Sequence, residues 1–494
     1  MANEPFDNRK FDTKVQYIKY MVLREVARRK WAGTLEAEWA DIPRVIIPGN
    51  KPTMRCCVYK ERAILFERVK IAMGEGRAVK ESEPENPHVI EVIDIACEEC
   101  PFGGYEVVAS SCRGCLAHRC ADVCPRDAII FNERYEAHID KEKCIECGAC
   151  AKVCPFSAIA NRKRPCVIAC KVDAITTKEG EVAAIDYDKC ISCGACVTQC
   201  PFGAITDISF ITDVIDIIQG SEDNKKHKVY ALVAPSISSQ FNYAKLGQVI
   251  SGIKELGFHT VVEVALGADM VSYHESAELV EKGVLTSSCC PAFVDYIKKN
   301  FPNLEKYVSA SLSPMGAIAK YIKTVDPGCK TVFIGPCTAK KAEAQLSKVS
   351  EYVDAVITFE ELQALFDSKD LDITTLEEDV LDNASYFGRI FARSGGLTDA
   401  VREGLREHGV TEDKFEFKPI ICDGIEACRT ALLKLSRSPK VLGGNFIEGM
   451  ACAGGCIGGA GCLTQGRKSR SGVDKYGMEA HEKTIKDAIS VLKE

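Results

Sequence analysis

The stretch KTVFIGPCTAKKAE, residues 330–343, indicates the fold class of most of this chain. A short run of β-branched and aromatic residues ends in a Gly-Pro turn, and a helix-forming segment follows it at once. The β-rich runs in HKVYALVAPS (227–236), HTVVEVALG (259–267) and KPIICDG (418–424) likewise end in a turn or lead into a helical segment. This alternation predicts an α/β fold with a mostly parallel sheet, whose ligand sites lie beyond the carboxyl ends of the strands. Cysteines and glycines fall at such ends.

The bulk composition restricts the possible partners. The chain has 494 residues, with a net charge of −7 from 63 basic and 70 acidic residues. No basic field therefore favours nucleic acid or anionic lipid. The first residues, MANEPFDNRKFDTK, lack the apolar core of a signal peptide, and no apolar run approaches the roughly 20 residues that span a bilayer. We expect a cytoplasmic protein that binds neither nucleic acid nor membrane.

Residues 1–90 are expected to form a mainly helical region that contains both tryptophans. Apolar residues recur at helical intervals in the segment 14–33, and a second helix is expected within 56–74. Cys56 and Cys57 precede this second helix with no further ligand nearby. Buried structural thiols are therefore favoured there over a metal site.

The 27 cysteines are the strongest signal in the composition, and sixteen of them lie between residues 91 and 206. Dense, regular cysteines in a long intracellular chain indicate metal ligands, whereas a disulfide scaffold suits short secreted chains. CIECGACAKVCP (144–155) and CISCGACVTQCP (190–201) have the spacing of bacterial ferredoxins, and CRGCLAHRCADVCP (112–125) is a third, slightly longer run. Zinc competes for a lone C-x2-C pair, but zinc sites rarely carry four cysteines at this spacing before a proline.

In two-cluster ferredoxins the fourth cysteine of each run ligates the other cluster, and this rule distributes the sixteen cysteines over four 4Fe–4S clusters. CEECP (97–101) and CVIAC (166–170) then form one run, interrupted by a complete inserted unit at about residues 108–160. Such nesting resembles the iron–sulfur subunits of molybdenum oxidoreductases. The alternative is a three-cluster domain in which Cys97, Cys100 and a further cysteine or two are free. The predicted sets are Cys112, Cys115, Cys120 and Cys154; Cys144, Cys147, Cys150 and Cys124; Cys190, Cys193, Cys196 and Cys170; and Cys97, Cys100, Cys166 and Cys200.

Three further cysteine stretches lie in the α/β part of the chain: TSSCCPAFV (286–294), IGPCTAKKAEA (334–344) and EGMACAGGCIGGAGC (448–462). Four thiolates drawn from them would hold one more cubane cluster. Cys452 and Cys456 share a face if their segment is helical, and the surrounding glycines allow close backbone approach to a bulky cofactor. A generic glycine-rich turn does not explain why these glycines interleave with two cysteines and a methionine.

These stretches resemble the signature motifs of the FeFe-hydrogenases, whose usual forms are TSCCPxW, MPCxxKxxE and ExMxCxxGCxxGG. The resemblance covers about residues 225–494. It implies a two-lobed, mostly parallel catalytic domain, here assigned to 207–494, after a nested α+β ferredoxin-like region at 91–206. The variants CCPAF and PCTAKKAE, together with the nested region, resemble the group B subclass.

The resemblance implies an H-cluster, in which a 4Fe–4S cluster is joined to a two-iron subsite carrying CO, cyanide and an azadithiolate bridge. Lys340 would donate a charged hydrogen bond to one cyanide, and the segment VAPSI matches the one that contacts the other. Residues implied near the subsite are Ala234, Pro235, Ser236, Lys340, Glu343 and Met450. The implied cluster ligands are Cys290, Cys337, Cys452 and Cys456, of which Cys456 also bridges to the subsite.

A route for protons is implied as well. Cys289 matches the family's proton-carrying thiol, and its side chain points away from that of Cys290 if the segment is extended. HESAEL (274–279) resembles the family segment EEATEL, which makes Glu275 and Glu278 relay carboxylates with Ser309 between them. The alternative for two glutamates three residues apart is a solvated helix face. Whether the group B subclass uses this route is open.

The departures from the motifs leave the implied cysteine ligands unchanged and affect residues implied to lie around the two-iron site. Gly335 replaces a methionine and Phe293 a tryptophan, the first motif has an extra serine, and Met315 and Gly316 replace polar residues. These changes are expected to alter potential and rate. Small apolar packing residues are the expected role of the remaining cysteines, Cys329, Cys422, Cys428 and Cys462.

The sequence therefore predicts a hydrogenase that interconverts H2 with protons and electrons. Electrons would pass through the accessory clusters to or from a small external ferredoxin, and maturation proteins would supply the two-iron subsite. No G-x-G-x-x-G follows a strand, so direct nicotinamide use is not expected. Two alternatives stay open: a hydrogen-sensing or regulatory protein of low turnover, and an electron-transfer or cluster-assembly protein without the two-iron subsite.

Overall fold

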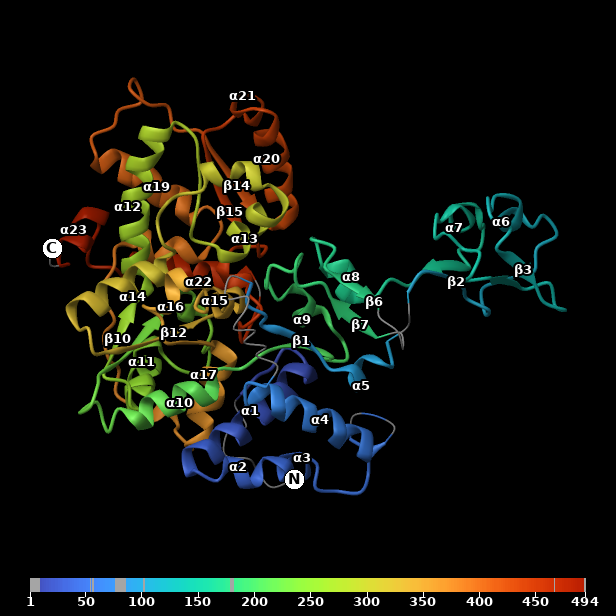
Figure 1. Cartoon of the computed structure of the whole chain (residues 1–494), viewed down its shortest axis with the longest axis horizontal. Coiled ribbons are helices and arrows are strands. Elements are labelled where there is room, and N and C mark those ends of the chain that lie inside the picture. Colours follow the sequence, from blue (N-terminus) through green and yellow to red (C-terminus); the bar gives the residue numbers. More distant parts are fainter. Residues whose placement is uncertain are drawn as a thin grey trace.

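The computed structural model describes residues 9–53, 55, 57–75, 86–100, 103–177, 182–465 and 467–492. Figure 1 shows three successive groups of elements: N-terminal helices, a slender middle part with short strands, and a large C-terminal part with two sheets. Within the described residues, no helix combines the length and apolar character that crossing a membrane requires.

The two helices predicted near the N-terminus are present. Helix α1 (Lys14–Ala32) begins where the Thr13 side chain accepts a hydrogen bond from the Gln16 amide, and it ends at Gly33 with φ +71°. Helix α4 (Val58–Ala72) begins directly after Cys57. The short helices between them are α2 (Leu35–Glu38) and α3 (Ile42–Ile46).

The expectation of buried thiols before α4 is wrong for Cys57. This thiol is only partly buried, at the position directly before the first residue of α4. Cys56 lies outside the described residues.

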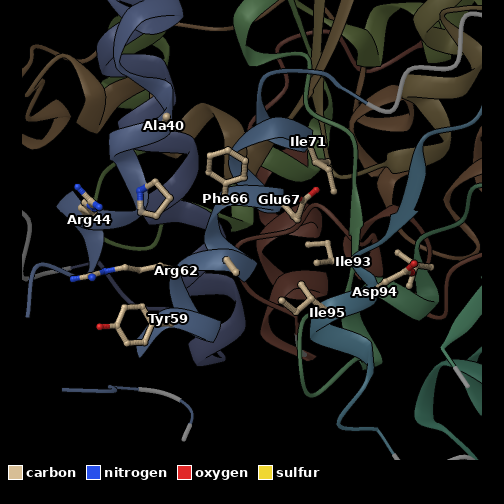
Figure 2. A pocket seen from close by; sticks show the side chains of 13 residues that line it. Ala40, Arg44, Tyr59, Arg62, Phe66, Glu67, Ile71, Ile93, Asp94 and Ile95 are labelled. Atoms are coloured by element: carbon tan, nitrogen blue, oxygen red, sulfur yellow. The ribbon is translucent and has the colours of Figure 1, made fainter. Parts of the chain in front are cut away.

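A cavity of about 680 Å³ separates α3 and α4 from strand β1 (Ile90–Val92) and helix α5 (Asp94–Cys97). In Figure 2, Phe66 and Ile71 of α4 lie across from Ile93 and Ile95. None of the lining residues is a cysteine. The cavity is therefore separate from the thiol sites.

Strand pairing in the middle part is nested. The outer pair joins β1 to β8 (Ile205–Asp207), and the inner pair joins β2 (Tyr105–Val107) to β5 (Ile159–Asn161); both pairs are antiparallel. A hairpin accompanies each pair: β3 (Ile129–Phe131) with β4 (Ala137–Ile139) in the inner unit, and β6 (Ile175–Thr177) with β7 (Ala183–Ile185) in the outer. Figure 1 shows the inner unit, hereafter the projecting unit, far from the large C-terminal part. The short helices are α6 (Arg119–Asp122), α7 (Ala149–Val153), α8 (Pro165–Ala169) and α9 (Ala195–Gln199).

The C-terminal part contains two parallel sheets, as predicted. The first has the order β10 (Thr260–Glu263), β9 (Val229–Val233), β12 (Lys330–Gly335), β13 (Ala355–Thr358). The second has the order β11 (Leu285–Thr286), β15 (Phe446–Met450), β14 (Pro419–Asp423). Four of these strands are the runs identified in the sequence. The mixed α/β, two-sheet fold is thereby confirmed.

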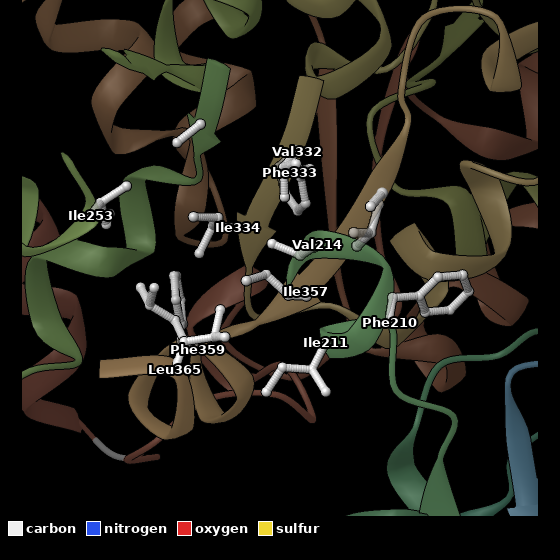
Figure 3. Close-up of a cluster of buried hydrophobic side chains, with 14 of the residues drawn as sticks. Phe210, Ile211, Val214, Ile253, Val332, Phe333, Ile334, Ile357, Phe359 and Leu365 are labelled. Carbon is white, nitrogen blue, oxygen red and sulfur yellow. The ribbon is translucent and has the colours of Figure 1, made fainter. Parts of the chain in front are cut away.

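Helices cover both sheets. Figure 3 shows Val214 of α10 beside Ile357 of β13, and Ile211 of the same helix belongs to the same buried hydrophobic cluster. Burying each such side chain contributes about 1.5–3 kcal/mol. The helices of this part are α10 (Ile211–Gly220), α11 (Leu246–Glu255), α12 (Val264–Lys282), α13 (Pro291–Asn300), α14 (Pro314–Val325), α15 (Thr338–Glu343), α16 (Ser347–Ser350), α17 (Phe359–Ser368), α18 (Tyr386–Arg389), α19 (Gly396–Glu407), α20 (Ile425–Arg437), α21 (Pro439–Leu442), α22 (Arg467–Met478) and α23 (Ile485–Ser490).

A buried ionic cluster joins the three groups of elements. The Lys341 Nζ of α15 lies 2.8 Å from Asp207 at the end of β8 and 2.8 Å from Glu361 of α17. Lys19 of α1 lies 2.5 Å from Asp207 and 2.6 Å from Glu360. Burial by itself raises the pKa of Asp207, but the charges of Lys19 and Lys341 outweigh it and hold this pKa well below its usual range. Asp207 therefore stays ionised and links all three groups.

Removing the central lysine tests this link. Lys341→Met leaves two buried carboxylates without their shared cation, so we expect a loss of about 3–5 kcal/mol in the free energy of unfolding. Urea unfolding under anaerobic conditions measures it. Lys475→Met, which removes an exposed ion pair with Glu479 at 3.8 Å, serves as the control. It should cost at most about 1 kcal/mol. Equal losses in the two variants would contradict a role for the buried cluster.

Candidate functional site

Two separate segments of the middle part bring four thiols together. Burial, together with the charges of Cys200, Cys100 and Cys97, raises the pKa of Cys166 to about 11. Burial also raises the pKa of Cys100, on which Cys97 and Cys200 act in the same way. These four thiols are the predicted split set, although about a hundred residues separate the first from the last.

A second group of thiols lies next to the split set. Burial raises the pKa of Cys196 well above its ordinary value, and the neighbouring charges are those of Cys193, Cys190, Cys170 and Cys166. The first three belong to the same predicted set as Cys196, and Cys166 belongs to the split set. The two sets are therefore adjacent.

The projecting unit holds the other two groups. The charges of Cys115 and Cys154 raise the pKa of the Cys120 thiol, and Cys112 packs in the same cluster of side chains. The charges of Cys144 and Cys124 raise the pKa of the Cys150 thiol. A small cavity is lined by four thiols of one predicted set, Cys124, Cys144, Cys147 and Cys150. Each run thus contributes its last cysteine to the other group.

Backbone N–H groups point at these thiols in a repeated pattern. Cys124, Cys154, Cys170 and Cys200 each accept a hydrogen bond from the amide four residues later, at 3.2–3.4 Å. In each case the residue three positions after the cysteine has a positive φ: Asp127, Ser157, Asp173 and Gly203. N–H···S hydrogen bonds stabilise negative charge on sulfur and tune iron–sulfur clusters.

Cysteines from three stretches converge between the two sheets of the C-terminal part. Burial raises the pKa of Cys452 well above its ordinary value, with further contributions from Cys337, Cys290, Cys193 and Cys456. Burial raises the pKa of Cys456 to about 12, where Cys337 and Cys290 act in the same direction. The four predicted ligands therefore lie together. Cys193 of the middle part lies beside them.

The segment between Cys452 and Cys456 is not an α-helix. Gly454 and Gly455 have φ values of +82° and +86°, and Cys456 begins a short 3-10 turn. A Cβ atom on Gly455 would lie 2.7 Å from the backbone nitrogen of Ser394. The glycines therefore form a tight turn, and a shared helix face does not bring the two cysteines together.

No three His, Cys, Asp or Glu side chains among the described residues are close enough to hold a single metal ion. A 4Fe–4S cluster has no such requirement, because each of its thiolates binds a different iron atom.

Lys340 extends its charge into this site. Its Nζ donates to Glu343 Oε2 at 2.6 Å and to the backbone carbonyl of Cys289 at 3.4 Å. Burial lowers the pKa of Lys340, but the charges of Glu343, Cys337 and Cys289 outweigh it and raise the pKa overall. The ammonium group is therefore buried and charged beside the thiols.

The opposite wall comes from the first sheet. Ala234 and Pro235 follow β9, and the Ala234 amide donates to Ile334 O at 2.9 Å. The Ser236 hydroxyl is fully buried and has no hydrogen-bond partner among the described residues. Met450, at the end of β15, is buried as well. A buried hydroxyl without a partner is costly, and an acceptor atom of a bound group would satisfy it.

Two carboxylates lie behind Cys289, on helix α12. Glu275 accepts hydrogen bonds from the amide and the hydroxyl of Ser288, both at 3.0 Å. Burial raises the pKa of Glu275 to about 7, the Ser288 hydrogen bonds lower it, and the Glu278 charge raises it. The Oε2 atom of Glu275 has no hydrogen-bond partner among the described residues.

Glu278 continues this line toward the surface. The Ser309 hydroxyl donates to Glu278 at 2.7 Å, and Lys282 forms an ion pair with it at 2.6 Å. Burial raises the pKa of Glu278, but the hydrogen bonds from Lys282 and Ser309 outweigh it, so the pKa is lowered overall. Ser309 also lowers the pKa of Glu275 and thus lies near both carboxylates. A fully solvated helix face is therefore the wrong description of this pair.

Two residues near the site escaped the sequence analysis. Ser288, the extra serine of the first motif, holds Glu275. Glu448 is fully buried and accepts hydrogen bonds from the Gly395 amide and from the amide and hydroxyl of Thr398, at 2.6–2.8 Å. The position of Glu448 at the start of the EGMAC motif could have indicated that it lies near the site.

The departures from the motifs have packing reasons. A Cβ atom on Gly449 would lie 2.2 Å from the Phe293 ring, and one on Gly335 would lie 2.5 Å from Phe333. Phe293 and Met315 are both fully buried. The four unassigned cysteines, Cys329, Cys422, Cys428 and Cys462, are buried, as expected of packing residues.

Residues 227–460 match the family model "Iron only hydrogenase large subunit, C-terminal domain". Residues 111–158 match "4Fe-4S dicluster domain" and residues 183–206 "4Fe-4S binding domain". These three segments are thus similar to an iron-only hydrogenase domain and to iron–sulfur domains.

Individual relatives fall into two kinds. The chain is similar to Iron hydrogenase 1 of Clostridium pasteurianum, at 28% identity over 48% of this chain and 50% of that protein. It is also similar to the cytosolic Fe-S cluster assembly factor NAR1 of Eremothecium gossypii, at 33% identity over 26% of this chain and 31% of that protein. The matched stretch spans about half of the length of the first of these relatives and less of the second. An [FeFe]-hydrogenase structure from Chlamydomonas reinhardtii aligns over 55% of this chain and 90% of its own, with 20% identity and a TM-score of 0.45.

The two adjacent cysteines of the first motif should differ in their effect on bound iron. Cys290→Ala removes one of four converging thiols, so we expect the loss of one cluster per chain by iron assay and electron paramagnetic resonance. Cys289→Ala should keep that cluster. Cys329→Ala, at a buried thiol outside all the sets, is the control and should keep all iron. Equal iron loss in the Cys289 and Cys290 variants would refute separate roles.

Proposed function

We propose that this protein is an FeFe-hydrogenase of the group B type, catalysing the reversible conversion of two protons and two electrons to H2 at an H-cluster. One observation carries the proposal. Four converging thiols, a buried charged lysine and a separate thiol backed by a carboxylate of near-neutral pKa share one buried site. The match of residues 227–460 to the iron-only hydrogenase domain supports it.

The donor set fits the cofactor. Cys290, Cys337, Cys452 and Cys456 would hold the 4Fe–4S part, and Cys456 would also bridge to the two-iron subsite. When bound, that subsite supplies the redox chemistry and the binding of hydrogen. Its cyanide ligands are acceptors, and the buried Lys340 ammonium and the unpartnered Ser236 hydroxyl are donors suited to them. Glu343 orients Lys340, while Ala234, Pro235 and Met450 line the same space.

Electrons would reach this site through four accessory 4Fe–4S clusters. The set that contains Cys193 would be next to the H-cluster, because the Cys193 charge acts on Cys452. The split set would follow, since Cys166 acts on Cys196. The two clusters of the projecting unit lie farthest out and would exchange electrons with an external ferredoxin (Figure 1). In this proposal residues 1–90 support the nested iron–sulfur region at 91–206, and 207–494 form the catalytic domain.

Protons would move along Glu278, Ser309, Glu275 and Cys289. Each member lies near the next, and Glu278 is partly exposed. The charge of Glu275 acts on the Cys289 thiol, whose pKa burial raises well above the ordinary value. A neutral thiol holds its proton until a stronger base takes it. Cys289 is therefore the last proton carrier of this chain.

A cytoplasmic location and dependence on maturation proteins complete the proposal. Dense reduced cysteines suit a reducing compartment. The similarity to proteins named cytosolic Fe-S cluster assembly factors supports a second candidate, a protein that never carries the two-iron subsite. A hydrogen-sensing protein of low turnover is the third. Cys289, Lys340 and Glu275 in one site favour the hydrogenase, because holding an iron–sulfur cluster alone requires none of them.

The pKa of Glu275, about 7, predicts opposite pH dependences for the two directions. H2 evolution requires protonated Glu275 and should fall as the pH rises through about 7. H2 oxidation requires the carboxylate and should fall as the pH drops through the same value. Glu275→Gln should lower both rates by about 100-fold or more without loss of iron. Glu281→Gln, at an exposed position of the same helix, is the control. Unchanged rates in Glu275→Gln would exclude this route.

Loading the two-iron subsite discriminates among the three functions. The full chain, purified anaerobically with its iron–sulfur clusters, is treated with a synthetic or maturase-built subsite. The hydrogenase proposal expects infrared bands of bound CO and cyanide together with H2 evolution, and no bands in Cys456→Ala treated identically. Missing bands in the unmodified chain favour the assembly-type protein. Bands with negligible turnover favour the sensor.

A further inference from the structure

Two buried arginines flank the split set of thiols, Cys97, Cys100, Cys166 and Cys200. Arg68 comes from helix α4, and Arg164 immediately precedes helix α8. Their exposed fractions are 6% and 2%. Neither residue belongs to a cysteine motif. Their position next to one thiol set is a product of the fold alone.

Arg68 is held beside Cys200. Its Nη2 donates to the carbonyl of Gly203, whose neighbour Ala204 donates its amide to Cys200 Sγ at 3.2 Å. Arg68 and Cys200 line one cavity of about 460 Å³. Arg68 does not line the separate cavity between α4 and β1. The guanidinium group therefore points toward the thiol set.

Arg68 forms no ion pair with a carboxylate of the described residues, and its Nε has no hydrogen-bond partner among them. Burial lowers the pKa of Arg68 to about 10, against an upward contribution from Cys200, so the side chain stays charged at neutral pH. A buried cation without a counter-ion is strongly unfavourable. Negative charge at the thiol set can offset that cost.

Arg164 lies beside the same set, at Cys100. Its Nη2 donates to the Cys100 carbonyl at 3.4 Å, and its charge acts on the Cys100 thiol. Arg164 stands two residues before Cys166, where the chain returns from the projecting unit. The split set therefore lies at the base of that unit, between it and the set of Cys196.

The neighbouring accessory sets have different charged side chains around them. Lys299 donates to the Cys190 carbonyl at 2.6 Å, but Asp295 pairs with it at 3.1 Å and offsets its charge. On Cys120 and Cys150 of the projecting unit, the acting side-chain charges are those of other cysteines. The split set is the one set flanked by two buried arginines within the described part of the chain.

We propose that Arg68 and Arg164 raise the reduction potential of the 4Fe–4S cluster held by Cys97, Cys100, Cys166 and Cys200. This cluster would then hold an electron that is on its way from the projecting unit to the catalytic site. Reduction adds one negative charge to a cluster, and nearby buried cations stabilise that added charge. A resting electron at the base of the unit suits a reaction that consumes two electrons, since external carriers can deliver them one at a time. The inference rests on the accessory clusters of the proposed function and requires no two-iron subsite.

Redox titration followed by electron paramagnetic resonance tests the proposal. The full chain is produced without maturation proteins and reconstituted with iron and sulfide, so that accessory clusters titrate in the absence of H2 chemistry. In Arg68→Gln, one cluster should show at least a tenfold lower ratio of reduced to oxidised form at a fixed potential, a shift of about 59 mV for one electron. Arg68→Lys, which keeps the charge, should restore most of it.

Two further variants complete the design. Arg164→Gln should shift the same cluster in the same direction, and it carries the test if Arg68→Gln fails to retain that cluster. Arg162→Gln, at a half-exposed arginine paired with Glu106 at 2.8 Å, is the matched control and should shift no cluster.

The outcomes separate this inference from the function it rests on. Unshifted potentials in the Arg68 and Arg164 variants, with all clusters present, would overturn the inference and leave the proposed function standing. An equal shift in Arg68→Lys and Arg68→Gln would also overturn it, because packing and not charge would then be responsible. A wild-type chain without iron at the split set would overturn the electron path itself.

Discussion

The carboxylate of Asp207, fixed between two buried lysines, is the contact on which the arrangement of the thiol sites depends. It ends the strand that follows Cys200, and it holds that strand against helices of the N-terminal and C-terminal parts. A buried carboxylate of this kind is stable only while both cations stay in place. The same junction is reinforced where the Thr338 hydroxyl donates to the Ser192 carbonyl at 2.7 Å. These contacts join the middle part to the C-terminal part close to the point where Cys193 lies beside Cys452.

Burial of several thiols in one place, whose thiolate forms repel each other, is the second constraint. Desolvation and mutual repulsion raise the pKa values of Cys290, Cys337, Cys452 and Cys456, so these groups lose their protons only when a cation compensates the charge. Iron binding and thiol deprotonation are therefore linked. The backbone amides that point at the accessory thiols act in the same direction, since they stabilise sulfur-centred charge without adding a mobile ion. A site of this kind is matched to a metal cluster far better than to four free thiols.

Local sequence patterns predicted those features of the structure that depend on residues close together in the chain. The parallel strands followed from β-rich runs ending in turns, and the thiol sets followed from cysteine spacing with one rule about exchanged ligands. The helix considered for Cys452 and Cys456 is not formed, because two glycines between them adopt positive φ. The spacing of four residues between the cysteines does not predict these φ values. Contacts between distant segments produce no periodic pattern in the sequence. Examples are Ser288 with Glu275, Lys341 with Asp207 and Arg68 with Cys200. They depend on which faces meet after the elements have formed.

In the proposed function, electrons and protons would approach the H-cluster site from different sides, and electrostatics would couple them. The thiol of Cys289 is buried among the charges of Glu275, Cys290, Cys456 and Glu448, all of which raise its pKa. Any additional negative charge held by the neighbouring thiol set therefore strengthens the hold of Cys289 on its proton, and loss of that charge weakens it. Lys340 opposes this effect, because its ammonium group lies within reach of the Cys289 carbonyl. The balance between the buried Lys340 cation and the surrounding buried anions thus sets how strongly the pKa of Cys289 depends on the charge of the thiol set. Substitutions around the ligands can change that balance without touching a single iron–sulfur bond.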